Sequence, residues 1–369
     1  MNRIAIAAAV AAVIGGYSAA ASAQTAPAAP AAPSLGAVLA ATPGLSITGY
    51  VYGSYDYFDT SSTLLRAYDT KPNGFNANGA AATVAFLPSS GFGGQVTVIG
   101  GNDAKALNGS NSLYLNNAFV QYATGGLTLM GGKFGSLAGA EVTNPMNNTT
   151  VSRSILFWDM EPGSVTGARA SYAVSPALTV IGGVNNGWVS PQPSNTGKTV
   201  ELGLTGSPSS LFSYTADYYR GQSPLFGGST NGVLQLLDLV GTFNVNSALT
   251  LGANVDLLSK DDVPLASGGT GTGKSNGLAL YASYALTSAW GVAARGEYVD
   301  DKDGLVSGTN GTANKLKELT LAVNYTPVKN VKLAAEIRQD KSDTAIFTNK
   351  DGTPTTKQNS LELMAVYSF

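Results

Sequence analysis

The fold of this chain is decided by the stretch Leu361-Glu362-Leu363-Met364-Ala365-Val366-Tyr367-Ser368-Phe369. Side chains of a β-strand alternate between its two faces. One face of this strand is therefore wholly apolar, and it carries Leu361, Leu363, Ala365, Tyr367 and Phe369. An apolar outer face that ends on aromatic residues is typical of a strand in contact with lipid. We therefore expect an all-β protein, a transmembrane antiparallel β-barrel.

The first residues indicate export. Arg3 precedes an apolar run over residues 4–14, and Ala21-Ser22-Ala23 supplies the small residues of a cleavage site. This pattern predicts a signal peptide over residues 1–23, because the run is too short to span a membrane as a helix. Residues 24–45 are rich in Ala and Pro and are interpreted as a periplasmic linker. A short helix over residues 34–41, docked beneath the barrel, is the alternative.

Composition excludes several classes of protein. The chain has no cysteine and no histidine, so disulfides, thiolate metal sites and histidine-dependent catalysis are ruled out. Its formal net charge of −2 gives no reason to expect nucleic acid as a partner. We expect no enzyme, no catalytic residue, no cofactor and no metal site.

Residues 46–369 repeat one pattern, in which two alternating strands are joined by a short turn and followed by a longer polar loop. Leu319, Leu321 and Val323, for example, oppose Glu318 and Thr320. Alternation alone also fits a soluble β-sandwich. Seven short turns, however, alternate with eight long loops, which predicts about 16 strands (14–18), short periplasmic turns and long extracellular loops. The long loops are expected at 59–77, 102–112, 134–163, 187–197, 220–232, 258–274, 300–314 and 340–357.

A barrel of this strand number has a lumen too wide for side chains to fill, so it requires a polar lining. Inward positions of the alternating strands carry charged residues that supply this lining. We expect the pore wall to include Glu201, Asp217, Asp256, Arg295, Glu297, Lys332, Glu336 and Arg338.

The loop over residues 134–163 is the longest. Opposed charges on a loop folded into the lumen would set a transverse field that selects solutes by charge. The alternative is a charged loop lying in solvent. The candidate constriction residues in and beside it are Lys133, Glu141, Arg153, Asp159, Glu161 and Arg169.

This region also resembles a known family. Gly132-Lys133-Phe134, Ala140-Glu141-Val142, Val151 to Phe157, Gly167-Ala168-Arg169 and Asn185 to Trp188 look like the OmpL-like β-barrel porins. The resemblance implies a diffusion porin of the Gram-negative outer membrane and carries over Glu141, Arg153 and Arg169 as site residues. It also implies that Tyr367 and Phe369 form the signal read by the barrel-assembly machinery.

Two short motifs are set aside. Gly268 to Ser275 matches the nucleotide-binding P-loop letter for letter, but strand-like sequence rather than a helix follows it. Asp300 to Gly304 partly matches a calcium loop, but it lacks the bidentate glutamate several residues on. We interpret both stretches as outer loops.

Together these patterns predict a passive channel for small hydrophilic solutes and ions, in contact with outer-membrane lipid and lipopolysaccharide. Near-balanced charge predicts weak ion selectivity, and this size class predicts a homotrimer by analogy alone. The alternative is a barrel with a closed lumen that serves as a surface adhesin or structural anchor. A TonB-dependent transporter is disfavoured because no plug domain precedes residue 46.

Overall fold

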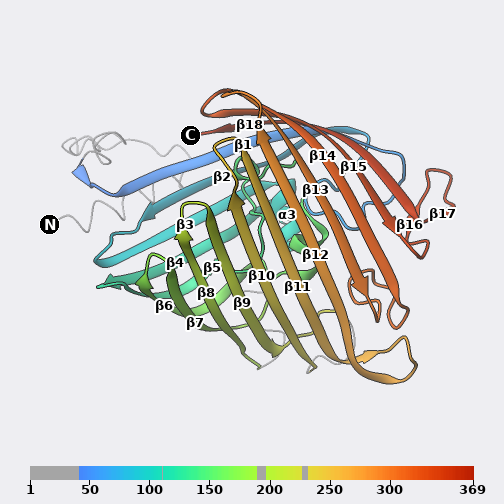
Figure 1. Cartoon of the computed structure of the whole chain (residues 1–369), viewed down its shortest axis with the longest axis horizontal. Coiled ribbons are helices and arrows are strands. Elements are labelled where there is room, and N and C mark those ends of the chain that lie inside the picture. Colours follow the sequence, from blue (N-terminus) through green and yellow to red (C-terminus); the bar gives the residue numbers. More distant parts are fainter. Residues whose placement is uncertain (1–40, 110, 189–196, 227–231) are drawn as a thin grey trace, which may run out of the picture.

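The computed structural model describes residues 41–109, 111–188, 197–226 and 232–369. Within these residues, 16 antiparallel strands close into a barrel in which each strand pairs with its neighbour in sequence and β1 pairs with β18 (Figure 1). The predicted fold class and strand number are confirmed. The predicted signal peptide, and the linker apart from its last residues, lie outside the described residues.

The wall consists of β1 (Leu45–Phe58) and β18 (Lys357–Ser368) with fourteen strands between them. Those strands are β2 (Gly74–Phe86), β3 (Gly91–Gly101), β4 (Leu113–Thr124), β5 (Leu127–Gly135), β6 (Ser164–Ser175), β7 (Leu178–Asn185), β8 (Thr199–Ser209), β9 (Phe212–Gln222), β10 (Val233–Asn244), β11 (Leu249–Pro264), β12 (Thr270–Ala285), β13 (Trp290–Asp301), β14 (Asn314–Val328) and β15 (Val331–Ser342).

The remaining elements lie in the long connections. They are helix α3 (Asn102–Asn108), the 3₁₀ turn η1 (Pro145–Asn147), the π-helical turn η2 (Leu156–Met160) and a small hairpin of β16 (Phe347–Thr348) and β17 (Pro354–Thr355). Among the described residues, no helix has the length and apolar character needed to cross a membrane.

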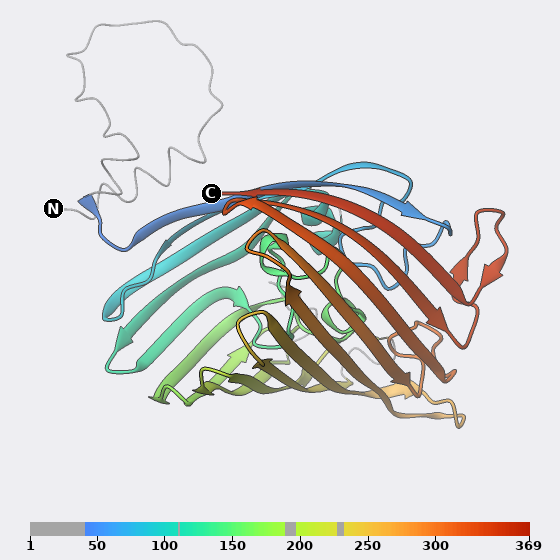
Figure 2. The same cartoon turned by 45° about the horizontal axis from the view of Figure 1, so that its top comes forward.

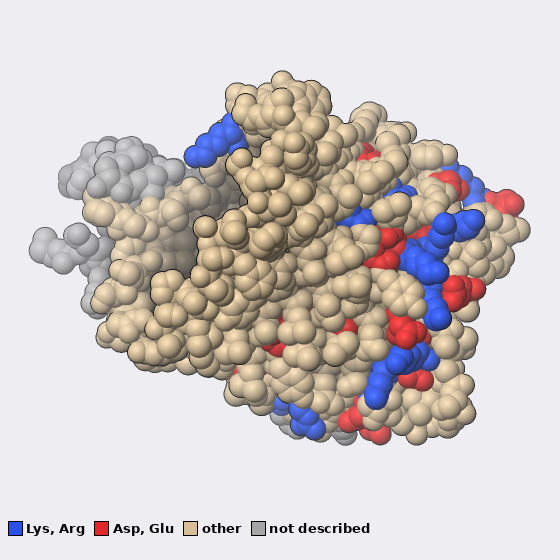
Figure 3. All heavy atoms as spheres, in the orientation of Figure 1, with Lys and Arg blue, Asp and Glu red and all other residues tan. Residues whose placement is uncertain are grey.

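The two faces of the wall differ as the alternation predicts. On β14, Leu319 and Leu321 are 58% and 47% exposed on the outer face, while Glu318 and Thr320 are buried inside. Charged side chains gather at the end of the barrel that carries the long loops, and a broad band beside it is free of them in this view (Figure 3). This is the surface expected of a barrel whose outer wall contacts hydrocarbon.

Aromatic rings mark the opposite end. Trp290 stacks on Tyr325 with ring centroids 4.4 Å apart, and Phe92 lies 4.9 Å from Tyr122. These residues flank short turns, where amphipathic rings are stable at headgroup depth. Both ends of the described chain lie at this end of the barrel (Figures 1 and 2).

The interpretation of residues 258–274 as a loop was wrong. β11 and β12 continue through most of this segment, with Lys260 opposite Gly273, and the turn falls at Gly268 and Gly269, whose φ angles are positive. Backbone hydrogen bonds between antiparallel strands require no apolar side chains, so the hairpin continues where the alternation is lost. The P-loop-like stretch is consequently a turn followed by a strand.

The acidic stretch from Asp300 to Gly304 begins within β13 and also differs from the expected outer loop. Asp301 is fully buried, and its carboxylate accepts hydrogen bonds from the backbone N–H groups of Leu305, Val306 and Ser307. It therefore organises the following loop, because a carboxylate can satisfy several backbone donors at once.

Candidate functional site

The connection between β5 and β6, residues 136–163, lies inside the barrel (Figure 2). Its turn η1 contacts β18, and its turn η2 contacts β11 and β12, so the loop crosses the lumen between distant parts of the wall. The crossing requires specific polar anchors, because backbone groups buried inside a protein are stable only when hydrogen-bonded.

One anchor is Glu336 of β15. Its carboxylate accepts hydrogen bonds from the backbone N–H of Val151 (2.5 Å), the N–H of Ser152 (3.1 Å) and the Ser152 hydroxyl (2.5 Å). The side chain is 1% exposed. Three donors on one buried carboxylate form a strong charge-assisted clamp, which fixes the middle of the loop against the wall.

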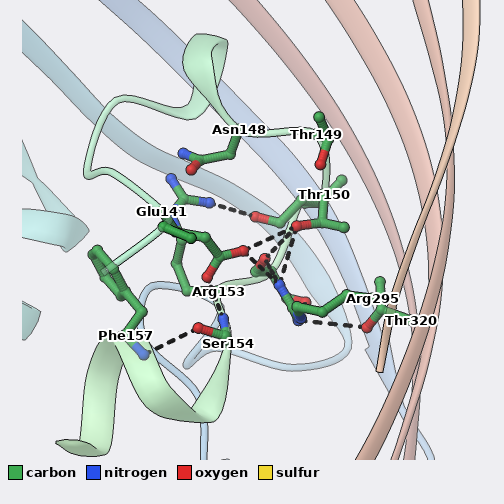
Figure 4. A network of polar contacts seen from close by, with 12 residues as sticks. Glu141, Asn148, Thr149, Thr150, Arg153, Ser154, Phe157, Arg295 and Thr320 are labelled. Atoms are coloured by element: carbon green, nitrogen blue, oxygen red, sulfur yellow. Dashed lines mark hydrogen bonds and ion pairs between the residues drawn. The ribbon is translucent and has the colours of Figure 1, made fainter. Parts of the chain in front are cut away.

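A second anchor is Arg295 of β13, which points from the wall toward Glu141 and Thr150 (Figure 4). It donates to the Glu141 carboxylate at 2.7 Å and to the Ser152 carbonyl at 2.9 Å. On the wall itself it lies 3.3 Å from a carboxylate oxygen of Glu297. Burial raises the pKa of Glu141, but the Arg295 and Arg153 guanidinium groups and the hydrogen bonds from Ser154 together outweigh burial and hold that pKa below its ordinary value.

Arg338 and Arg66 extend this network toward the long-loop end. Arg338 donates to the carbonyl of Arg153 at 2.6 Å and to that of Leu65 at 3.1 Å, so one wall side chain holds two loops. Arg66, from the loop after β1, pairs with Asp69 at 2.7 Å and with Glu362 at 3.0 Å. We call the network of Arg66, Arg295 and Arg338, with the carboxylates they contact, the arginine network.

Arg153, a predicted constriction residue, has a different placement. Its guanidinium donates to the backbone carbonyls of Val142 (3.0 Å), Thr143 (3.0 Å) and Val151 (2.8 Å), and it is 2% exposed. It lies over the Tyr68 ring, 5.5 Å from the centroid. The side chain thus joins the two arms of the loop, and no ion pair of Arg153 occurs among the described residues.

The other predicted basic residues contact a wall carboxylate, an aromatic ring or the carbonyl groups of the loop. Arg169 of β6 pairs with Glu201 of β8 at 2.5 Å and lies over the Phe134 ring. Lys133 lies 3.8 Å from the centroid of the Tyr114 ring. Lys332 donates to the loop carbonyls of Pro145 and Asn148.

Of the predicted acidic residues at the loop exit, Glu161 is buried and Asp159 is half-buried. Burial raises the pKa of Asp159 to about 7. Burial and the nearby Asp238 carboxylate raise the pKa of Glu161 well above its ordinary value. Glu161 faces Asp238 and Asp256 of the wall, whereas no ion pair of Asp159 occurs in the described part of the chain.

Several residues that hold the loop were not among the predicted site residues. Tyr219 accepts from the Leu137 N–H at 2.8 Å, Asp238 from Gly139 at 3.2 Å and Asn254 from Ala140 at 2.9 Å. Each lies on the inward face of its strand, and strand alternation could have identified Asp238. Nothing in the sequence pattern indicates which loop atom each one meets.

The loop divides the lumen unequally. On the side of β9–β14, buried apolar residues of the wall and of the long loops, such as Ile155, Leu156 and Leu236, form a packed cluster. On the side of β2–β6, a cavity of about 880 Å³ remains between the loop and the wall. Neutral polar groups and aromatic rings dominate its lining, which includes Thr83, Gln95, Thr97, Asn116, Asn117, Tyr68, Tyr114 and Phe157. The charged residues in its lining are Glu141, Glu161 and Arg169.

The last residue closes the barrel seam. Backbone hydrogen bonds join Phe369 and Gly49 in both directions, at 2.9 and 3.0 Å. A Cβ at Gly49 would lie 2.5 Å from the Phe369 ring, so only glycine leaves room for it. Tyr367 and Phe369 are about half exposed on the outer wall, with their rings stacked.

Known structures share this fold. The outer membrane channel DcaP of Acinetobacter baumannii is 16% identical, with a TM-score of 0.60 over 88% of this chain and 97% of that chain. OmpT of Vibrio cholerae in its trimer form is 14% identical, with a TM-score of 0.60 over 88% and 99%. The anion-selective porin from Comamonas acidovorans is 11% identical, with the same TM-score and the same coverage.

No curated protein matches the chain in sequence. The profile of the family described as beta-barrel porin-2, OmpL-like, matches residues 44–369, which include every strand of the barrel. The resemblance expected from residues 131–190 is therefore confirmed along the whole wall. The chain belongs to the OmpL-like β-barrel porin family, a family of outer-membrane porins.

Proposed function

We propose that this protein is a passive diffusion channel for small hydrophilic solutes, with a preference for uncharged ones, and that the inward loop sets its cutoff. The observation that carries the proposal is the cavity between the loop and β2–β6, with its lining of amides, hydroxyls and aromatic rings. Such groups can replace part of the water bound to a solute, and they create no strong electric field of either sign in the passage. Weak ion selectivity follows.

Two of the three charged residues in the cavity lining also support this proposal. Glu141 is paired with Arg295, and Arg169 is paired with Glu201, so neither presents an uncompensated charge. In this proposal Arg153, Lys332 and Glu336 shape the pore by holding the loop. The predicted wall residues Arg295, Glu297 and Arg338 act in the same way.

Planar bilayer recording of the purified protein tests this function. We expect stepwise conductance, a reversal potential near zero in a KCl gradient, and liposome swelling with small neutral sugars. Arg169→Gln should move the reversal potential toward cation selectivity, while Lys302→Gln on an outer loop should leave it unchanged. Absence of stepwise conductance from folded protein would refute the channel.

A closed barrel that serves as an adhesin or anchor is the second candidate. The apolar cluster of the wall and the long loops favours it, because buried side chains pack inside the barrel on the side of β9–β14. Liposome swelling separates the two: a closed barrel gives none, even after reconstitution at high density. Family membership favours a channel over an enzyme.

The cellular setting is part of the same proposal. We infer export with removal of residues 1–23, insertion by the barrel-assembly machinery through Tyr367 and Phe369, contact with lipopolysaccharide, and assembly as a homotrimer. The trimer form of OmpT, a barrel of the same fold, supports the oligomeric state. Cross-linking in the native membrane, followed by electrophoresis, tests it.

A further inference from the structure

Three aspartates form a row across adjacent strands of the inner wall. Asp238 of β10 stands opposite Asp217 of β9 on one side and opposite Asp256 of β11 on the other. All three are at most 2% exposed. Like charges placed directly opposite each other on neighbouring strands destabilise a sheet, so this row requires a compensating partner.

The inward loop adds a fourth carboxylate. Oxygen atoms of Glu161, Asp238 and Asp256 all lie within 4.8 Å of one another. Gly139 makes this approach possible, because its φ is +95° and a Cβ there would lie 1.9 Å from a Glu161 carboxylate oxygen. The loop is therefore shaped to place a buried glutamate against two buried aspartates.

Several carboxylate oxygens of these four residues have no hydrogen-bond partner. Both carboxylate oxygens of Asp217, Oδ2 of Asp256 and Oε1 of Glu161 accept no hydrogen bond, although all are buried. In the described part of the chain, the donors that reach the group are neutral: the Gly139 N–H donates to Asp238, and the Asn254 amide donates to Asp238 and Asp256. Among the described residues no arginine or lysine forms an ion pair with these four acids, and buried carboxylates in that state are costly.

We propose that Glu161, Asp238 and Asp256 bind a hard divalent cation, calcium above all, with Asp217 as a further oxygen ligand. An all-oxygen site rich in carboxylates is the donor set that calcium prefers, because it accepts six to eight oxygens in flexible geometry. Zinc is disfavoured, since the chain has no histidine or cysteine. The cation joins the exit of the loop to β10 and β11.

Protons compete with a cation for this carboxylate cluster. Carboxyl groups that touch one another are also stable when they share protons. The side chains of Asp217 and Asp256 each contact that of Asp238, so either occupant satisfies the geometry. The experiment must therefore measure binding itself, independently of conductance, so that its failure is distinct from a failure of the channel proposal.

Isothermal titration with CaCl₂ on the full-length folded protein, stripped with a chelator in detergent at neutral pH, makes that measurement. We expect one calcium ion per chain and weaker binding of MgCl₂, because magnesium requires a stricter octahedral geometry. Asp238→Asn and Asp256→Asn should each weaken calcium binding by about 10-fold or more. Asp300→Asn, which removes a surface carboxylate 3.9 Å from Lys302, is the control and should bind normally.

A second measurement needs no variant. If calcium binds only the folded barrel, the unfolding temperature of the wild-type protein must rise with calcium concentration. The proposal is overturned if stripped, folded wild-type protein binds neither calcium nor magnesium, which would leave protons as the occupants. It is also overturned if folded Asp238→Asn and Asp256→Asn bind calcium as tightly as the wild type.

Discussion

Two regions of the inner wall hold the same loop by different means. In the arginine network of β13–β18, the buried carboxylates Glu141, Glu318 and Glu362 lie against the guanidinium groups of Arg295 and Arg66. In the aspartate row of β9–β11, equally buried carboxylates face one another with no cation from the described chain. Burial is the same in both regions, and only the source of positive charge differs.

This difference shows what each attachment depends on. The cations of the arginine network come from the polypeptide itself, so the middle of the loop is attached without a cation from solution. The aspartate row requires a partner from solution, so the loop exit is sensitive to conditions. Removing charge should therefore have opposite effects in the two regions.

The largest effect is expected from Arg295→Met. The substitution leaves Glu141 and Glu297 buried without their cation, and it leaves Glu318 with Arg338 alone. This costs about 3–5 kcal/mol of unfolding free energy. Denaturant titration of the folded protein in detergent micelles measures this loss. Lys302→Met, at an exposed pair, should cost less than about 1 kcal/mol, and equal losses at the two sites would contradict the role of the network.

A smaller effect is expected at an isolated carboxyl, that of Asp103 in α3. Burial raises its pKa from 3.8 to about 6, although the Tyr52 hydroxyl donates to it at 2.6 Å. A raised pKa means that the folded state holds the proton longer, so stability is full below pH 4 and declines as pH rises toward 6. The decline is about 3 kcal/mol.

Asp103→Asn should abolish this pH dependence. Between pH 4 and 7, the stability of the variant should depend less on pH than that of the wild type. Thermal unfolding measures this, and so does hydrogen exchange of residues 102–109 after correction for intrinsic rates. Asp351→Asn, at a fully exposed position, serves as the control. A parallel pH profile for Asp103→Asn and the wild type would exclude this group as the source.

In the aspartate row, loss of a charge should stabilise the protein when calcium is absent. Asp256→Asn removes repulsion from Asp238, so in chelator its unfolding free energy should exceed that of the wild type by about 1–2 kcal/mol. Calcium should reverse the order, because only the wild type has the full ligand set. Glu141→Gln, the matching substitution in the arginine network, should lower the unfolding free energy in both buffers. A lower unfolding free energy for Asp256→Asn than for the wild type in chelator would contradict the proposed difference between the two regions.

The smallest effect is expected at Ser152, whose hydroxyl donates to Glu336 at 2.5 Å. Ser152→Ala removes this hydrogen bond and the two that the hydroxyl accepts from Arg295 and Arg338. Both backbone donors remain on the Glu336 carboxylate and both guanidinium groups keep other acceptors, so the loss should be about 1 kcal/mol. Current noise in single-channel recordings should increase as the loop loosens. Ser247→Ala on an exposed short turn should change neither quantity.

The fold was largely predictable because its physics is local. Period-2 alternation places Leu319 and Leu321 outside and Glu318 inside without any knowledge of distant contacts. The number of short turns, seven, was also predicted correctly, because a turn between two apolar strands interrupts that alternation sharply. Residues 258–274 were misjudged because a strand above the membrane loses alternation while its backbone pairing continues.

The site was less predictable because its contacts join residues far apart in the chain. Glu336 meets Val151, and Arg295 meets Glu141, through the three-dimensional path of one loop. Sequence reasoning selected these charged residues as inward-facing, but could not tell a side chain that lines water from one that holds a loop. It also found no oxygen-ligand group, since Glu161, Asp238 and Asp256 follow no spacing motif.

The seam between β1 and β18 has a consequence for how the molecule forms. Tyr50 pairs with Ser368, and the Phe369 ring occupies the space that the absent side chain of Gly49 leaves. The first and last strands of the barrel are therefore paired directly with each other. Each other strand pair joins segments closer together in the chain, whereas this one demands the greatest loop-closure entropy. Pairing of β1 with β18 is thus the last step of barrel formation. Until then both strands are edge strands, whose unpaired backbone groups can pair with another sheet.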